Sequence, residues 1–166
     1  MRKDLYWLDG PWPGKLALAA RPRGGDWLRD DLANWKRAGI DQVLSLLTPE
    51  EERDLGVRDE PVETKAQGMK FDSLPIPDRQ IPRSESTLAE ALEKVNDALA
   101  AGKNVVVHCR QGIGRSGLVA ACLLVKNGMS PGAAVEAVSA ARGLTIPETT
   151  EQREWIDHYA TALTKS

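Results

Sequence analysis

Apolar positions along the chain fall into two alternating patterns, short aliphatic or β-branched runs and longer segments with helical spacing. The short runs, each bounded by turn residues, predict strands at residues 5–8, 16–20, 42–47, 70–76 and 105–107. The helical spacing predicts helices at residues 26–38, 49–54, 60–68, 84–102, 118–128, 131–142 and 147–163. Strands that alternate with helices predict an α/β fold in which helices flank both faces of a central sheet.

Capping residues mark where several of these helices are expected to begin. A short polar side chain precedes the helical segment at Asp26, Thr48, Ser84 and Ser130. Thr48-Pro49-Glu50-Glu51 has the form of a capping box, with proline at the first helical position. The acidic run 50–54 is therefore interpreted as the solvated start of a short helix, and no further function is assigned to it.

The connections between the strands predict how the sheet is assembled. The first two strands are separated by Asp-Gly-Pro-Trp-Pro-Gly, which predicts a hairpin or an edge pair. The later strands are separated by helices, so the sheet is expected to be mixed and largely parallel. The chain has no internal repeat and no linker long enough to separate domains, and residues 1–166 are expected to form a single domain.

Composition excludes several classes of protein. The 166 residues carry a net charge of −2 and the pI is about 5.8, which argues against a nucleic-acid partner bound by a basic surface. Two cysteines are too few for a disulfide framework. Neither a secretory h-region nor an apolar run long enough for a membrane span is present. We expect a monomeric cytoplasmic protein with no membrane partner.

Residues 104–118 carry the chemistry. Val105 to Val107 read as a short buried strand, the segment 109–117 contains three glycines, and a helical pattern starts at Leu118. A loop wrapped against a helix N-terminus points backbone N–H groups inward and adds the positive end of the helix dipole, so it can bind a tetrahedral dianion. This segment therefore predicts a phosphate-binding loop.

Three side chains of this segment suit phosphate chemistry. The field of the loop favours thiolate over thiol at Cys109, which makes it a nucleophile at neutral pH. Arg115 offers a planar fork that matches two phosphate oxygens. Ser116 can donate a hydrogen bond to the sulfur and help it leave when a covalent intermediate breaks down. Cysteine and arginine at this spacing also occur by chance, but the strand, the glycines and the following helix make the combination specific.

The chain resembles the cysteine-dependent protein tyrosine phosphatase superfamily, whose signature is His-Cys-x5-Arg-Ser/Thr. His108, Cys109, Arg115 and Ser116 fill that signature without a departure. The segment Pro-Ile-Pro-Asp at 75–78 is similar to the kinase-associated, dual-specificity-like branch. The resemblance implies a protein tyrosine phosphatase-like fold and a phosphate site formed by Arg110, Gln111, Gly112, Ile113, Gly114 and Arg115.

Phosphate monoester cleavage by a thiolate also needs an acid for the leaving oxygen and then a base for water. Asp78, in a proline-braced loop after a strand, is the expected residue, and Asp72 is the alternative. His108 is expected to orient Cys109 by hydrogen bonds. The resemblance assigns Gln152 to positioning the hydrolytic water. Cys122 is expected to be a core residue, with a redox role as the alternative.

These residues predict a phosphomonoesterase that acts on phosphotyrosine in proteins, and on phosphoserine or phosphothreonine if its pocket is shallow. The protein supplies the whole charge clamp, so no metal or other cofactor is expected. A pseudophosphatase would use the same pocket only to bind a phosphorylated partner, but it would have lost a catalytic residue. A non-protein phosphomonoester, RNA 5′-phosphate among them, is a further alternative. Sulfurtransferases or related phosphatases would not need Asp78, and low-molecular-weight phosphatases carry their cysteine near the N-terminus.

Overall fold

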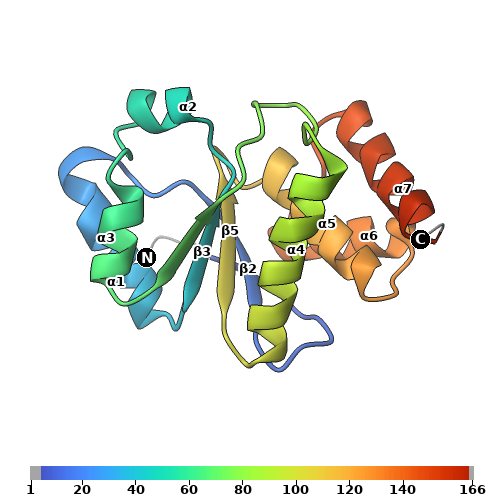
Figure 1. Ribbon diagram of the computed structural model, residues 1–166, viewed down its shortest axis with the longest axis horizontal. Coiled ribbons are helices and arrows are strands. Elements are labelled where there is room, and N and C mark those ends of the chain that lie inside the picture. Colours follow the sequence, from blue (N-terminus) through green and yellow to red (C-terminus); the bar gives the residue numbers. More distant parts are fainter. Residues whose placement is uncertain (1–4, 165–166) are drawn as a thin grey trace.

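A five-stranded mixed sheet forms the centre of the computed structural model, which describes residues 5–164 (Figure 1). Its strands are β1 (Tyr6–Leu8), β2 (Leu16–Ala20), β3 (Gln42–Ser45), β4 (Lys70–Ser73) and β5 (Val105–Cys109). They lie in the order β1-β2-β5-β3-β4, and only β1 runs antiparallel to its neighbour. The predicted opening hairpin and the predicted mixed, largely parallel sheet are both confirmed.

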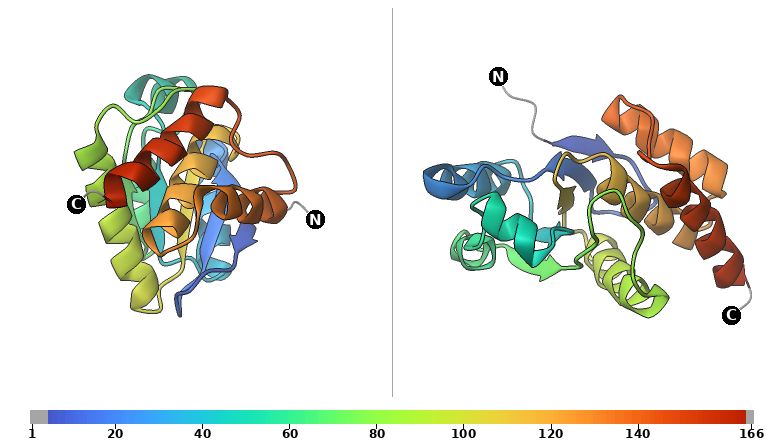
Figure 2. Two further views of the ribbon diagram at one scale, coloured as in Figure 1. Left: turned by 90° about the vertical axis from the view of Figure 1, so that its right-hand side faces the viewer. Right: turned by 90° about the horizontal axis from the view of Figure 1, so that it is seen from above.

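Helices cover both faces of the sheet, as the pattern predicted (Figures 1 and 2). One face carries the 3-10 turn η1 (Gly25–Trp27), α1 (Leu28–Arg37) and α3 (Glu60–Ala66), and α2 (Pro49–Asp54) lies near the end of the sheet where β3 stops. The other face carries α4 (Glu85–Ala100), α5 (Gly114–Lys126), α6 (Pro131–Arg142) and α7 (Thr150–Thr164). Within residues 5–164, no helix combines the length and the apolar character that crossing a membrane requires.

The alternation of side chains along β5 divides the core into two. Val105 and Val107 point into the larger cluster, which also contains Leu118 and the other buried residues of α4 to α7. Val106 points into the smaller cluster with Trp35 of α1. β5 is buried along its whole length because strands flank it on both edges and helices cover both faces. Its last residue is Cys109, so the nucleophile leaves the sheet at its centre, where ligands bind in open α/β sheets.

Most caps form as predicted, and several boundaries differ: the strands predicted to end at residues 47 and 76 end at 45 and 73, and the strand predicted to end at 107 runs to 109. Thr48, Ser84 and Ser130 each accept a hydrogen bond from the first turn of their helix. Asp26 does not cap its helix, because a 3-10 turn that contains it precedes α1. The helix expected from residue 118 begins at residue 114, and the helix expected from residue 147 begins at residue 150.

Candidate active site

The loop between β5 and α5 wraps around the sulfur of Cys109. The backbone N–H of Gly112 donates to Sγ at 3.3 Å, and the hydroxyl oxygen of Ser116 lies 3.4 Å from it. Gly112 has a φ of +72°, and a Cβ there would lie 2.6 Å from the carbonyl carbon of Ala19. The loop therefore needs glycine at this position, both for its backbone conformation and for its close approach to β2.

Arg115 lies in the first turn of α5 with 1% of its side chain exposed. Its Nη1 donates to Glu51 at 2.6 Å and to the carbonyl oxygen of Ile76 at 2.8 Å. Its Nη2 donates to Glu51 at 2.9 Å and to Asp78 at 3.2 Å. Among residues 5–164, no acceptor lies at Nε, so that N–H can still serve a substrate oxygen.

The charges around Arg115 keep it protonated. Burial by itself lowers the pKa of this guanidinium. The hydrogen bond to Glu51 and the negative charges of Cys109 and Glu51 outweigh burial, so the pKa of Arg115 is raised above its ordinary value. Burial by itself raises the pKa of Glu51. The hydrogen bonds from Arg115 and Thr48 lower it by more than burial raises it, so the pKa of Glu51 lies below its ordinary value.

Asp78 lies beside Arg115, as an acid in this site must. It comes from the proline-rich segment after β4, and its side chain is 48% exposed. It lines a hollow of about 600 Å³ together with Arg110 and Glu51. The structure thus brings the predicted acid to the same opening as Arg110 of the nucleophile loop and into contact with Arg115, although Asp78 lies more than 30 positions earlier in the chain.

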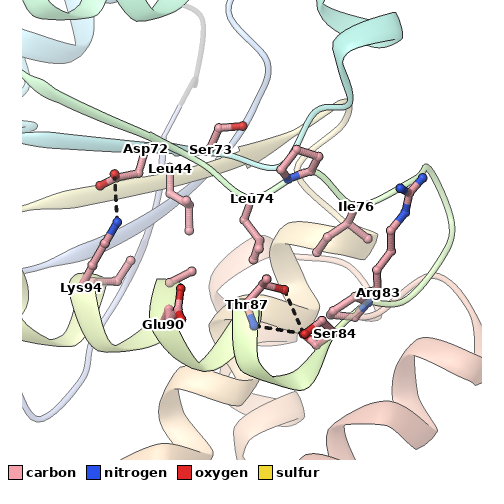
Figure 3. Close-up of a pocket in the computed structure, with 14 residues that line it drawn as sticks. Leu44, Asp72, Ser73, Leu74, Ile76, Arg83, Ser84, Thr87, Glu90 and Lys94 are labelled. Atoms are coloured by element: carbon pink, nitrogen blue, oxygen red, sulfur yellow. Dashed lines mark hydrogen bonds and ion pairs between the residues drawn. The ribbon is translucent and has the colours of Figure 1, made fainter.

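Asp72, the alternative acid, occupies a different hollow (Figure 3). It belongs to β4, accepts from Gln42 at 3.3 Å and forms an ion pair with Lys94 at 3.8 Å. That hollow, of about 390 Å³, lies between β4, α4 and the segment after β4. Asp78 contacts Arg115, whereas Asp72 pairs with Gln42 and Lys94, so the structure favours Asp78.

Gln152 is fully buried although it is a polar residue in the first turn of α7. Its Nε2 donates to the carbonyl oxygen of Gln80 at 3.1 Å. It also forms a capping box with Thr149, each backbone N–H donating to the other side chain. A Cβ on Gly114 would lie 3.0 Å from its Oε1, so Gln152 packs against the phosphate loop.

Three residues that support the loop were not predicted from the sequence. Glu51 was interpreted as a solvated acid. Glu60, in α3, is fully buried, and its Oε2 lies 2.6 Å from Nε2 of His108. Arg142, in α6, donates to the carbonyl oxygens of Gly112 and Gln111 at 3.0 and 3.3 Å. The capping box was a visible signal for the position of Glu51, but no local pattern indicates the other two contacts.

The remaining residues singled out from the sequence differ in burial. Arg110 and Gln111 are exposed at the mouth of the loop, while Ile113 is half-buried. Cys122 is fully buried in α5, and burial raises the pKa of its thiol, as in a core residue. Within residues 5–164, no group of three or more potential metal ligands is arranged to hold an ion.

Comparison with known proteins gives both a family and a fold. A family model described as "Polymorphic toxin system, DSP-PTPase phosphatase" matches residues 17–129. Cyclin-dependent kinase inhibitor 3 of Rattus norvegicus and that of Sus scrofa are each 33% identical over 87 residues, which is 51% of this chain and 41% of the relative. The chain therefore spans less than half the length of these curated relatives.

Solved structures match over almost the whole chain. Kinase associated phosphatase with its catalytic cysteine replaced by serine superposes with a TM-score of 0.91 at 23% identity, over 100% of this chain and 99% of the other. Tk-PTP in its active form gives a TM-score of 0.80 at 27% identity, over 97% and 99%. The family match covers more than half of the chain and includes Asp78, Cys109 and Arg115. The chain belongs to the DSP-PTPase phosphatase family.

Proposed function

We propose that this protein is a cysteine-dependent phosphatase that removes phosphate from phosphotyrosine, and also from phosphoserine or phosphothreonine, in protein substrates. The observation that carries the proposal is a chain of contacts within one loop: the Gly112 amide donates to the Cys109 sulfur, and the buried Arg115 that ends the loop donates to Asp78. Membership of the DSP-PTPase family and the resemblance to Cyclin-dependent kinase inhibitor 3 support it.

The first chemical step forms a cysteinyl-phosphate. The substrate phosphate lies in the loop 110–115 against the backbone amides and the guanidinium of Arg115. The Cys109 thiolate attacks phosphorus, the ester P–O bond breaks, and Asp78 gives a proton to the leaving oxygen. In the free protein, Nη2 of Arg115 donates a hydrogen bond to Asp78. Bound phosphate accepts that hydrogen bond instead, and the released Asp78 carboxyl then lies near the leaving group.

The second step hydrolyses that intermediate. Asp78, now ionised, takes a proton from water, the resulting oxygen attacks phosphorus, and the S–P bond breaks. Ser116 lies 3.4 Å from the sulfur, from where its hydroxyl stabilises the departing thiolate. The role of Gln152 in positioning the water stays a prediction, since its amide is engaged with Gln80 and Thr149.

We further propose that the protein acts as a monomer, as one domain over residues 1–166, and in a reducing compartment such as the cytoplasm. A thiolate nucleophile survives only where thiols are kept reduced. The acidic pI supports substrates other than nucleic acid.

Hydrolysis of p-nitrophenyl phosphate without metal and with a reductant tests the mechanism. The wild type should be active, Cys109→Ser inactive, and Asp78→Ala slower by roughly 10²- to 10⁴-fold in kcat, because the leaving oxygen then departs without a proton donor. Mass spectrometry of rapidly quenched wild-type protein should show one phosphate on the peptide that contains Cys109. If the wild type bound a phosphotyrosine peptide without hydrolysing it, the proposal of an enzyme would be wrong, and the protein would be a phosphate-binding module.

A further inference from the structure

A buried carboxylate behind the phosphate loop takes no part in the mechanism described so far. Glu60, in the first turn of α3, is fully buried, and its Oε2 lies 2.6 Å from Nε2 of His108 on β5. The indole of Trp35 covers the His108 ring, with 5.7 Å between ring centroids. The pair lies on the face of the sheet opposite to the Cys109 side chain, because neighbouring residues of a strand point to opposite faces.

A contribution to the stability of the fold does not explain why a carboxylate is buried at position 60. Among residues 5–164, neither Glu60 Oε1 nor the hydroxyl of Thr64, one turn along α3, has a hydrogen-bond partner. A buried polar atom without a partner costs stability, and a buried ion pair is often no more stable than an apolar replacement. A role in the neighbouring site explains why a charged side chain is placed here.

The hydrogen bonds of His108 determine where its protons lie. Nδ1 faces the backbone carbonyl oxygen of Cys109 at 3.4 Å, and a carbonyl can only accept, so Nδ1 carries a proton. Nε2 faces a carboxylate oxygen, so a second proton lies between His108 and Glu60. With that second proton on the ring, His108 is an imidazolium and Glu60 is its counter-ion.

We propose that Glu60 is a positioning residue of the active site, which keeps His108 doubly protonated. The imidazolium then holds the carbonyl of Cys109, where the phosphate loop begins, and places a positive charge behind the thiolate. This inference rests on the proposed function and identifies a residue that supports its nucleophile.

Other charged groups around the pair and the sulfur also contribute to the local field. Glu52 of α2 is close enough to Glu60 and His108 for both charges to affect its own protonation. On the other side of the sheet, Arg115 of α5 faces the sulfur, and Glu51 and Asp78 contact Arg115. The Glu60→Gln substitution does not alter Arg115, Glu51 or Asp78, so a change in the behaviour of Cys109 would come from the Glu60–His108 pair and from Glu52 beside it.

The test follows the thiolate directly and needs no substrate. Alkylation of Cys109 by iodoacetamide is measured against pH in a Cys122→Ala background, with and without Glu60→Gln. Glutamine keeps the size of the side chain but cannot balance an imidazolium, so His108 loses one proton at neutral pH. We expect the midpoint of the alkylation profile to rise by roughly one pH unit, and the acid limb of kcat/KM for p-nitrophenyl phosphate to move with it.

Thr64→Val is the matched control, since Thr64 is on the same helix, is equally buried and also has a hydroxyl without a partner. It should leave the alkylation midpoint unchanged. An unchanged midpoint in folded Glu60→Gln, or an equal shift in Thr64→Val, would overturn the proposal.

If Glu60→Gln does not fold, a measurement on the wild-type protein tests the proposal instead. The ¹⁵N chemical shifts of the His108 ring at neutral pH should show a proton on both nitrogens, and a neutral ring would overturn the proposal. The outcomes separate this inference from the proposed function. A protein without phosphatase activity whose alkylation profile still depends on Glu60 would refute the enzyme and leave the role of Glu60 standing.

Discussion

Arg115 is the largest of the fully buried side chains, and its charge has to be balanced inside the protein. Glu51 supplies most of that balance through two hydrogen bonds, while the same carboxylate accepts from the backbone of Thr48 and closes the capping box of α2. Glu51 therefore fixes both the start of a helix and the orientation of the guanidinium. A planar donor held in this way is ready for phosphate before the substrate arrives.

Replacing Glu51 by glutamine should destabilise the protein by about 2 kcal/mol at pH 7, because the buried guanidinium loses its main counter-charge. The pKa of Glu51 is lowered in the folded state, so its contribution is present above its ordinary value of 4.5 and is lost as the pH falls through the folded pKa. The difference between variant and wild type should therefore shrink below about pH 4. Urea unfolding at pH 7 and pH 3.5 measures both effects.

Glu52→Gln is the control for this prediction, one residue along the same helix. Burial, then the charge of Glu60, raises the pKa of Glu52, so its ionised form opposes folding at neutral pH. This substitution should leave stability unchanged or increase it slightly at pH 7. If both variants lost the same amount of stability, α2 would be sensitive to glutamine at either position. That result would contradict a specific role for Glu51.

The strand, loop and helix that carry the nucleophile could be predicted from local sequence, and the start of α5 could not. The apolar run of β5 and the His-Cys-x5-Arg-Ser signature lie within a dozen residues. Gly112, Gly114 and Gly117 lower helix propensity, which moved the expected start of α5 to residue 118. The structure shows why glycine is needed at positions 114 and 117 within the helix. A Cβ at either position would lie within 2.6 Å of a side chain in the segment before α7.

Contacts between distant segments are the part of the site that sequence reasoning missed. Arg115 and Glu51 are 64 positions apart, and His108 and Glu60 are 48 apart. No helical or strand period relates such pairs. Asp78 was predicted because the superfamily has an acid in a loop at a similar place, and not because any periodicity brings it to Cys109.

Gly112→Ala tests the loop as an element. The new Cβ would meet the backbone of Ala19 at 2.6 Å, so the loop must move away from β2 and its amide from the Cys109 sulfur. We expect a loss of two orders of magnitude or more in kcat/KM for p-nitrophenyl phosphate, as for a misplaced oxyanion donor. Gly102→Ala is the control, since Gly102 has a similar φ of +85° but open space around it. It should cost about 1 kcal/mol in stability without loss of activity, and equal activities in the two variants would contradict the role of the loop.

In the whole molecule, the last helix links the end of the chain to the acid loop. Gln152 donates to the carbonyl oxygen of Gln80, and Arg79 forms an ion pair with Glu148 at 3.2 Å. Both contacts join the segment that carries Asp78 to residues beyond the family match, which ends at residue 129. Figure 2 shows α7 lying across the same side of the sheet as α5. The position of the acid thus depends in part on Glu148 and Gln152, about 70 positions further along the chain.

Gln152→Ala distinguishes this anchoring from the water-positioning role that the superfamily resemblance implies. If Gln152 holds the acid loop, its loss displaces Asp78 and slows formation of the cysteinyl-phosphate, so stopped-flow traces with p-nitrophenyl phosphate should show no burst. If it positions water, only hydrolysis slows, and a burst of one p-nitrophenol per protein should precede a slow steady state. The two hydrogen bonds that engage its amide favour the first outcome, with a loss of roughly 10- to 100-fold in kcat. Glu151→Ala, an exposed neighbour on α7, should behave as wild type.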